Sequence, residues 1–258
     1  RLRGVSRQPM EGASWLEQAI VSRYGTGLDV PVDVLAVGAH PDDVELAVGG
    51  MLADLARRGV RVAVVDLTDG EPTPYGTPET RRQESHEAAR ELGLAARLTL
   101  RLPNRYLFDT VEHRRLVAAV LRLLRPRLLL AHYWEDAHPD HWAASALADA
   151  GRFYGKLTKT DLPGEPYLVP RTLYFLASHL RLHPPVAVVV DVSGAYERKR
   201  AAIRAYRSQF EANPAGRDVP ERVESRDRYY GQLIGVSYGE PLLSREPIGV
   251  ADLTRLLW

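Results

Sequence analysis

The strongest constraint on the fold is the alternation of short apolar runs with helix-like stretches that starts at Asp33. The apolar runs are rich in Val, Leu and Ala and are bounded by Gly, Pro and polar residues, a pattern typical of buried strands. The predicted strands are 34–38, 61–67, 99–102, 127–131, 172–176 and 186–190, and the predicted helices are 46–58, 79–92, 111–124, 142–153, 195–209 and 222–233. This alternation favours an α/β fold with a mostly parallel sheet and helices on both faces.

The chain divides into a short N-terminal stretch and one long α/β region. Residues 1–30 precede the alternation, and we predict an extension there with a short amphipathic helix around Trp15 and Ile20. No shift in composition interrupts residues 31–258, so we predict a single domain over that range. With 258 residues, 45% of them apolar, the chain is long enough to bury a large core.

Composition argues against several classes of function. The formal net charge is +1, which disfavours an electrostatic nucleic-acid binder. There is no cysteine, so any metal must be held by histidine, aspartate or glutamate. No apolar stretch reaches the roughly 20 residues of a membrane span, and residues 1–8 lack the apolar core of a secretory leader. We therefore expect a cytoplasmic protein that acts on a small molecule, without a nucleic-acid or membrane partner.

Two clusters of histidine and aspartate follow predicted strands and carry the candidate chemistry. Residues 39–45 (AHPDDVE) come directly after the strand at 34–38, and residues 138–141 (HPDH) come soon after the strand at 127–131. Ligand sites of open α/β sheets lie at the carboxyl ends of strands. Proline at position 41 restricts the histidine before it to extended conformations, so a tight turn can aim neighbouring side chains at one point.

These side chains are those of a metal-dependent hydrolase. We predict that His40, Asp43 and His141 bind one divalent metal, because two imidazoles and one carboxylate leave a position open for water. Zn²⁺ is expected, and Fe²⁺ accepts the same ligand types. Asp42, beside the metal, is the predicted general base. His138, when protonated, is the predicted stabiliser of a developing oxyanion.

Other polar residues near the clusters receive supporting roles. We predict that Asp140 orients His138 or a metal ligand, and that Glu45 complements the dipole of the following helix. Arg81 follows a loop rich in Gly, Pro and Thr, where it either holds a substrate carboxylate or lies exposed on a helix. His132 is expected to have a packed or hydrogen-bonded role.

The two clusters resemble the signature motifs of the LmbE-like, PIG-L family of zinc-dependent N-acetylglucosamine (GlcNAc) deacetylases, Ala-His-Pro-Asp-Asp-x-Glu and His-Pro-x-His. Further segments resemble the branch that deacetylates GlcNAc-malate in bacillithiol biosynthesis: 66–71 (DLTDGE), 76–79 (GTPE), 102–105 (LPNR), 208–210 (SQF) and 233–240 (LIGVSYGE). The resemblance covers residues 33–253 and implies a Rossmann-like fold and a homo-oligomer such as a hexamer.

The resemblance implies the same metal ligands, His40, Asp43 and His141, and the same general base, Asp42, as predicted above from the residue types. It implies that His138 acts as an imidazolium supported by Asp140, and that Arg81 contacts the malate carboxylates. The chain departs from the branch at Asn104, where many relatives have aspartate, and over residues 213–220. The malate half of the substrate is therefore less well supported than the deacetylation.

Three alternatives remain open at this level. Relatives deacetylate GlcNAc-inositol, GlcNAc-phosphatidylinositol or chitooligosaccharides, or cleave thiol conjugates, with the same chemistry. A non-enzymatic alternative is a sugar-binding module with a structural metal, but such a site has no need of the spare carboxylate of Asp42. A metal phosphoesterase would require bridged metals, for which the ligands suffice only if Glu45 or Asp140 is included.

Overall fold

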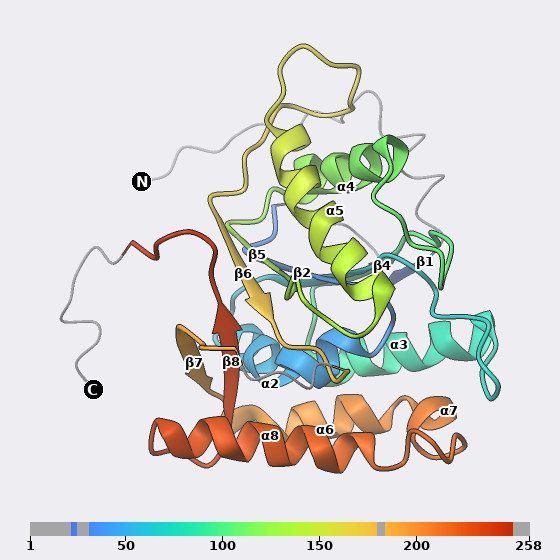
Figure 1. Cartoon of the computed structure of the whole chain (residues 1–258), viewed down its shortest axis with the longest axis vertical. Helices are drawn as coiled ribbons and strands as arrows, with labels where there is room; N and C mark the ends of the chain where they lie inside the picture. The colour runs from blue at the N-terminus through green and yellow to red at the C-terminus, as the bar shows by residue number, and fades with distance from the viewer. Residues whose placement is uncertain (1–21, 25–30, 180–183, 250–258) are drawn as a thin grey trace.

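The computed structural model describes residues 22–24, 31–179 and 184–249, and it contains one eight-stranded sheet (Figure 1). In chain order the strands are β1 Ser22–Tyr24, β2 Val34–Gly38, β3 Val62–Asp66, β4 Ala96–Thr99, β5 Leu128–His132, β6 Arg171–Phe175, β7 Val188–Asp191 and β8 Gly239–Leu243. Their order across the sheet is β1-β4-β3-β2-β5-β6-β8-β7. The predicted α/β class with a mostly parallel sheet is confirmed.

The five central strands, from β4 to β6, are parallel and form the Rossmann-like part of the sheet. The chain runs from β2 outward to β3 and β4, and then returns to place β5 on the other side of β2. The sheet therefore has its topological switch point between β2 and β5, where ligands bind in folds of this class.

Antiparallel strands extend the sheet at both edges. β1 lies within the segment predicted as an N-terminal extension, and it pairs with β4. The short helix predicted around Trp15 and Ile20 lies outside the described residues. At the other edge β8 pairs with β6 and β7. β1 and β8 were not predicted.

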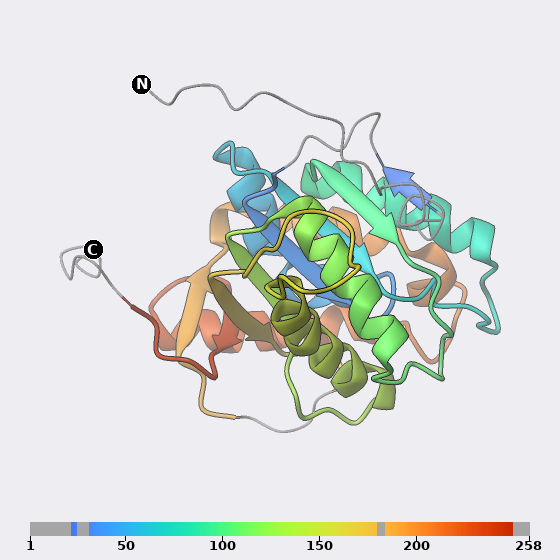
Figure 2. The same cartoon turned by 90° about the horizontal axis from the view of Figure 1, so that it is seen from above.

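Helices cover both faces of the sheet, as predicted. Their bounds are α2 Asp43–Arg57, α3 Pro78–Leu92, α4 Val111–Leu124, α5 Pro139–Gly155, α6 Tyr196–Arg204, α7 Arg207–Phe210 and α8 Val219–Leu233. α4 and α5 pack together on one face, and α2 and α3 lie on the other (Figures 1 and 2). α6, α7 and α8 form an outer layer beyond α2 and α3. None of the described helices is long and apolar enough to span a bilayer.

Strand β2 shows why the central strands are apolar throughout. Alternate side chains of a strand point to opposite faces of the sheet. Leu35 and Val37 belong to the core under α4 and α5, whereas Val34 and Ala36 belong to the core shared with α2 and α3. Because both faces are covered, all of its residues are buried, and the strand forms a continuous apolar run.

The strand predicted at 99–102 is wrong, because β4 is Ala96–Thr99 and carries a buried arginine. Arg97 is 1% exposed, and its guanidinium pairs with the buried carboxylates of Asp66 and Glu45. Charged side chains are rare in buried strands, so the residues around Arg97 gave no signal of a strand.

The predicted role of Glu45 as a helix-dipole complement is incomplete, because its side chain pairs with Arg97 and also accepts a hydrogen bond from the Tyr206 hydroxyl.

The helix predicted at 195–209 forms as two helices, α6 and α7. The chain leaves the helical conformation at Tyr206, which has φ −84° and ψ 60°. The turn places the Tyr206 side chain in the core, where it is fully buried.

Substitution of Arg97 with methionine is expected to lower the free energy of unfolding by about 3–5 kcal/mol, because two buried carboxylates would lose their counter-ion. Urea unfolding followed by circular dichroism measures the change. The control is Arg114→Met, which removes a surface ion pair with Asp109 and is expected to leave the unfolding midpoint close to that of wild type. Equal unfolding midpoints for the two variants would contradict this account.

Candidate metal centre

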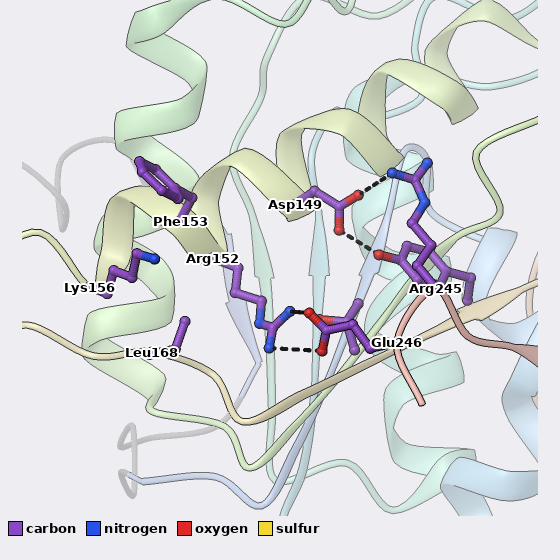
Figure 3. Close-up of a pocket in the computed structure, with 9 residues that line it drawn as sticks. Asp149, Arg152, Phe153, Lys156, Leu168, Arg245 and Glu246 are labelled. Carbon is purple, nitrogen blue, oxygen red and sulfur yellow. Dashed lines mark hydrogen bonds and ion pairs between the residues drawn. The ribbon is translucent and has the colours of Figure 1, made fainter. Parts of the chain in front are cut away.

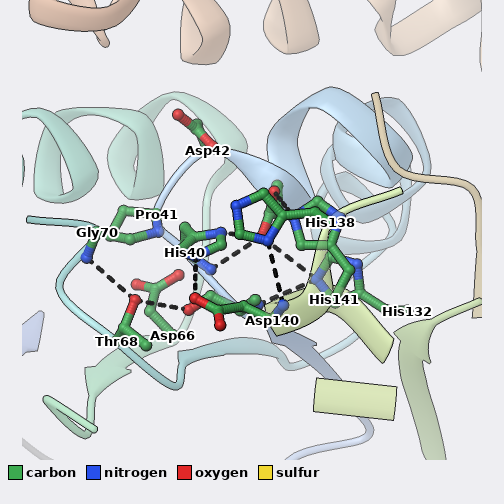
Figure 4. Close-up of polar contacts among 12 residues, drawn as sticks. His40, Pro41, Asp42, Asp66, Thr68, Gly70, His132, His138, Asp140 and His141 are labelled. Atoms are coloured by element: carbon green, nitrogen blue, oxygen red, sulfur yellow. Dashed lines mark hydrogen bonds and ion pairs between the residues drawn. The ribbon is translucent and has the colours of Figure 1, made fainter. Parts of the chain in front are cut away.

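The two predicted clusters meet at the carboxyl ends of β2 and β5, at the switch point of the sheet (Figure 4). The turn that carries His40 and Asp43 connects β2 to α2. His138 is the N-cap of α5, and its Nδ1 accepts a hydrogen bond from the Asp140 N–H at 3.2 Å. α5 therefore starts three residues earlier than predicted, and His141 lies in its first turn.

The Asp43 carboxylate lies at the centre of the site. Its Oδ1 is 3.3 Å from His141 Nε2, and its Oδ2 is 3.3 Å from His40 Nδ1. The three side chains each offer one ligand atom, and these atoms lie within 4.8 Å of one another. Both ring nitrogens of His141 are buried, and neither makes a hydrogen bond of good geometry among the described residues. This donor set fits a divalent metal.

Electrostatics show that this cluster attracts positive charge. Burial would raise the pKa of Asp43, but the neighbouring His141 and His132 hold that pKa well below its usual value. Burial would lower the pKa of His141, yet Asp43 and Asp136 raise it to about 10. For His40, burial likewise opposes the effect of Asp140 and Asp43, which raise its pKa to about 9. The Asp43 carboxylate thus favours positive charge on His40 and His141, and a metal cation bound by the three side chains would take the place of those protons.

Two further residues support the cluster, and both lie at or after the end of β5. Asp136 Oδ2 is 3.1 Å from His141 Nδ1, and its Oδ1 accepts the His138 N–H at 2.9 Å. His132 Nε2 accepts the Ala39 N–H at 3.0 Å and lies 3.3 Å from Asp43 Oδ2. His132 therefore has a hydrogen-bonded role, as predicted. Asp136 was not predicted, and its position between β5 and the second cluster was the available signal.

Substitution of Asp136 with asparagine is expected to weaken metal binding by about 10–100-fold, because a carboxylate on the second nitrogen of a ligating histidine fixes its ring and raises its basicity. Competition with a chelator of known affinity measures the change. The control is Asp149→Asn, whose carboxylate pairs with Arg245 away from the cluster. Unchanged affinity in the Asp136 variant would show that His141 needs no such support.

Asp42 lies beside the cluster in a strained conformation. It is the N-cap of α2 with φ 108°, a left-handed value that is uncommon outside glycine. Arg81 holds the turn, because its Nη1 donates to Asp42 Oδ2 at 3.2 Å and its Nη2 donates to the Pro41 carbonyl oxygen. Burial raises the pKa of Asp42 to about 7, although Arg81 opposes this rise. A carboxylate with such a pKa suits proton transfer near neutral pH.

The structure places Arg81 inside the protein. Its side chain is 3% exposed, so the alternative of an exposed helix arginine is wrong. The guanidinium is engaged with Asp42 and Pro41, and it also lines the pocket in front of the cluster. Its contact with a substrate carboxylate stays a prediction.

Asp140 supports a different histidine from the one that the resemblance implied. Its Oδ2 is 3.1 Å from His40 Nε2, and its carboxylate also accepts the N–H groups of Arg105 and Leu107. The side chain therefore orients His40, the second of the two options that the chemistry left open. The hydrogen bond between Asp140 and His138 comes from the backbone N–H of Asp140 and not from its carboxylate.

The surroundings of His138 disfavour a charged ring, and its action as an imidazolium stays a prediction. Burial lowers its pKa to about 4, and the positive charges of His141 and His40 act in the same direction. Since Nδ1 accepts the Asp140 N–H, the proton of the neutral ring lies on Nε2. His138 can still donate a hydrogen bond, from Nε2, to an oxygen in the pocket.

A pocket of about 930 Å³ opens in front of the cluster. Its wall includes Asn104, Arg105, His179 and Arg222 in addition to the site residues. The His179 ring centroid is 5.4 Å from that of His138. Sequence patterns gave His179 no role, because it has no partner at metal-ligand spacing along the chain.

A second pocket, of about 370 Å³, lies along α5 and contrasts with the first (Figure 3). Its carboxylates are paired, Asp149 with Arg245 and Glu246 with Arg152. None of the nine residues that line it is a histidine. Of these two pockets, the one at the switch point is therefore the better candidate for chemistry.

Comparison with known proteins identifies the class of protein that this fold and site define. Residues 35–150 match the model of the PIG-L family, GlcNAc-PI de-N-acetylase. The chain is 30% identical to the diacetylchitobiose deacetylase of Thermococcus kodakarensis over 86% of this chain and 88% of that protein. It is 27% identical to a 1D-myo-inositol 2-acetamido-2-deoxy-alpha-D-glucopyranoside deacetylase of Nocardia farcinica, over 72% of this chain and 83% of that protein.

Solved structures share this fold, and one of the two below is a deacetylase. The conserved protein TT1542 of Thermus thermophilus is 40% identical with a TM-score of 0.79, over 86% of this chain and 98% of that one. The N,N'-diacetylchitobiose deacetylase of Pyrococcus horikoshii is 27% identical with a TM-score of 0.71, over 89% and 88% of the two chains. The protein belongs to the PIG-L, LmbE-like family of deacetylases.

Proposed function

We propose that this protein hydrolyses the N-acetyl group of a GlcNAc conjugate, using one divalent metal held by His40, Asp43 and His141. The observation that carries the proposal is the convergence of these three ligand atoms within 4.8 Å at the end of a pocket that also contains Asp42. Zn²⁺ is the metal we propose, because two imidazoles and one carboxylate are ligands that suit it, and Fe²⁺ is the alternative. A bound metal would supply Lewis-acid polarisation and a lowered pKa of water.

The residues around the ligands can carry the proton transfers of amide hydrolysis. Asp42 accepts a proton from the attacking water and returns it to the amine that leaves when the C–N bond breaks. Arg81 holds the Asp42 carboxylate at the strained turn, where Asp42 lines the pocket. His138 donates its Nε2–H to the acetyl oxygen as negative charge develops there. Acetate and the free amine are the products.

For the second half of the substrate we propose an anionic group, with GlcNAc-malate as the first choice. Apart from Asp42 and Asp43, the Asp, Glu, Lys and Arg side chains among the described residues that line the pocket are all arginines. Arg105 donates to the Pro72 carbonyl oxygen and has no carboxylate partner among the described residues. The ion pair of Arg222 among the described residues is with the exposed Asp218. A guanidinium without a buried partner is available for a substrate carboxylate.

The relatives with named substrates supply the competing hypotheses. Their names specify diacetylchitobiose and a GlcNAc-inositol, whose second halves are uncharged. The deciding experiment compares kcat/KM for acetate release from GlcNAc-malate, GlcNAc-inositol and diacetylchitobiose, with wild type and Arg105→Gln. We expect the malate conjugate to be the best substrate and the variant to lose about 10-fold or more on it alone. Preference for an uncharged conjugate would overturn the malate assignment, and release from none would overturn the deacetylase proposal.

A further inference from the structure

Helix α2, which carries Asp43 in its first turn, is broken near its middle. Val48 has φ −136° and ψ 17°, values outside the helical range. In an unbroken helix the N–H of Gly50 would bond the carbonyl of Leu46, and the N–H of Met51 would bond that of Ala47. The break separates these four backbone groups, which are buried and require other partners.

Two charged side chains take the places of the missing partners. The Glu240 carboxylate accepts the Gly50 N–H at 2.8 Å and the Met51 N–H at 2.7 Å. The Arg226 guanidinium donates from Nη2 to the Leu46 carbonyl at 2.8 Å, with the Ala47 carbonyl at 3.4 Å. The Glu240 carboxylate and the Arg226 guanidinium thus lie between the two halves of the helix. Insertion of side chains into the backbone hydrogen bonds is a known cause of a sharp bend.

Glycine at position 50 lets the carboxylate reach the helix. A Cβ at this residue would lie 3.1 Å from Glu240 Oε1 and 2.9 Å from Val192 Cβ. The close approach therefore depends on the absence of a side chain at that position.

Two more buried charges complete this group. Lys199 Nζ is 2.6 Å from Glu240 Oε1 and 2.6 Å from Asp227 Oδ2, and Asp227 Oδ1 accepts the Arg226 guanidinium at 2.8 Å. Lys199, Asp227 and Glu240 are 0% exposed. We call Lys199, Arg226, Asp227 and Glu240 the ion wedge. Its two positive and two negative charges balance, which lets it remain in the protein interior.

The ion wedge connects directly to the walls of the candidate metal centre. The segment before the break, Asp43–Ala47, begins with the central carboxylate of the cluster. Arg226 also donates from Nη1 to the carbonyl of Leu176, in the segment after β6 that lines the same pocket. Side-chain charges, and not backbone groups of a continuous helix, therefore hold the buried groups on both sides of the break.

We propose that the ion wedge is a positioning device for metal binding: it breaks α2 so that the short segment of Asp43 can place its carboxylate against His141 and His40. This inference rests on the proposed function, in which these residues hold a divalent metal. Lys199, Arg226, Asp227 and Glu240 are positioning residues, since they act through the backbone of the segment.

The test uses Glu240→Gln, which keeps the size of the side chain but directs an amide N–H at one of the two backbone N–H groups. The protein is loaded with Co²⁺, whose visible absorption reports the geometry of the ligands, and Co²⁺ affinity is measured by competition with a chelator. We expect the variant to lose about 10-fold or more in affinity and to show a changed spectrum. Glu240→Asp, which keeps the charge but is too short to span both N–H groups, is expected to show a smaller change in the same direction.

The matched control is Arg122→Met. Arg122 is a buried arginine that donates to backbone carbonyls, among them Gly155 and Leu162, on the opposite face of the sheet. This control is expected to lose stability but keep the wild-type Co²⁺ spectrum and affinity. Wild-type spectrum and affinity in both Glu240 variants, with wild type itself binding Co²⁺, would overturn the inference. If wild type bound no Co²⁺, the proposed function would fail first.

Discussion

Replacing Asp42 with asparagine is expected to lower kcat for acetate release by about 10²–10⁴-fold and to leave metal content unchanged. Asparagine tolerates the left-handed conformation of this residue and can still accept the hydrogen bond from Arg81. The substitution therefore removes the proton acceptor while it retains the turn. The pair of measurements is steady-state kinetics and metal analysis of the same preparation.

The control for this prediction is Asp54→Asn on the same helix. Asp54 pairs with Arg57 and Arg58 on the surface, so its loss is expected to leave kcat unchanged. A wild-type rate in the Asp42 variant would contradict the role of general base. Loss of metal from the variant would instead place Asp42 among the ligands.

Replacing Asp43 with alanine is expected to abolish metal binding and to reduce acetate release to the background rate. The Asp43 carboxylate contacts His40, His132 and His141, each at 3.3 Å, and it is the one anionic member of the proposed ligand set. Its loss should cost more metal affinity than the roughly 10–100-fold expected for the supporting residue Asp136. Metal analysis after dialysis, with titration of Zn²⁺ into the stripped protein, measures the effect.

Stability provides a second readout for the Asp43 variant. Metal stabilises the folded wild type by about 2.7 kcal/mol when its free concentration is about 100 times Kd. Thermal unfolding of wild type should therefore shift upward when Zn²⁺ is added, and unfolding of the alanine variant should not. An equal shift in both proteins would mean that the metal binds elsewhere.

Local patterns were sufficient to predict the centre of the fold. Strand β2 and helix α4 match the predicted bounds, because an apolar run between turn residues and a capped amphipathic stretch each have their own signal. The two clusters were also found to converge, since residues at the carboxyl ends of neighbouring parallel strands must lie close together. His40, Asp43 and His141 meet for that reason.

The features that could not be predicted depend on pairing between distant charges. β4 was misplaced because Arg97 is buried only through its pairs with Asp66 and Glu45. β8 was missed because Glu240 lies in a buried strand through its ion pair with Lys199 and its hydrogen bonds to helix α2, which are all distant in the chain. The lowered pKa of His138 likewise depends on residues that lie on several elements. No local pattern reports which charges will meet in space.

The most direct test of the central claim is acetate release as a function of bound Zn²⁺. Metal is removed from the protein and restored stepwise, and the rate with GlcNAc-malate is measured at each step. We predict no release without metal, a linear rise with occupancy, and a plateau near one metal per chain. Full activity of the stripped protein, or a plateau only at two metals per chain, would contradict a single centre formed by His40, Asp43 and His141.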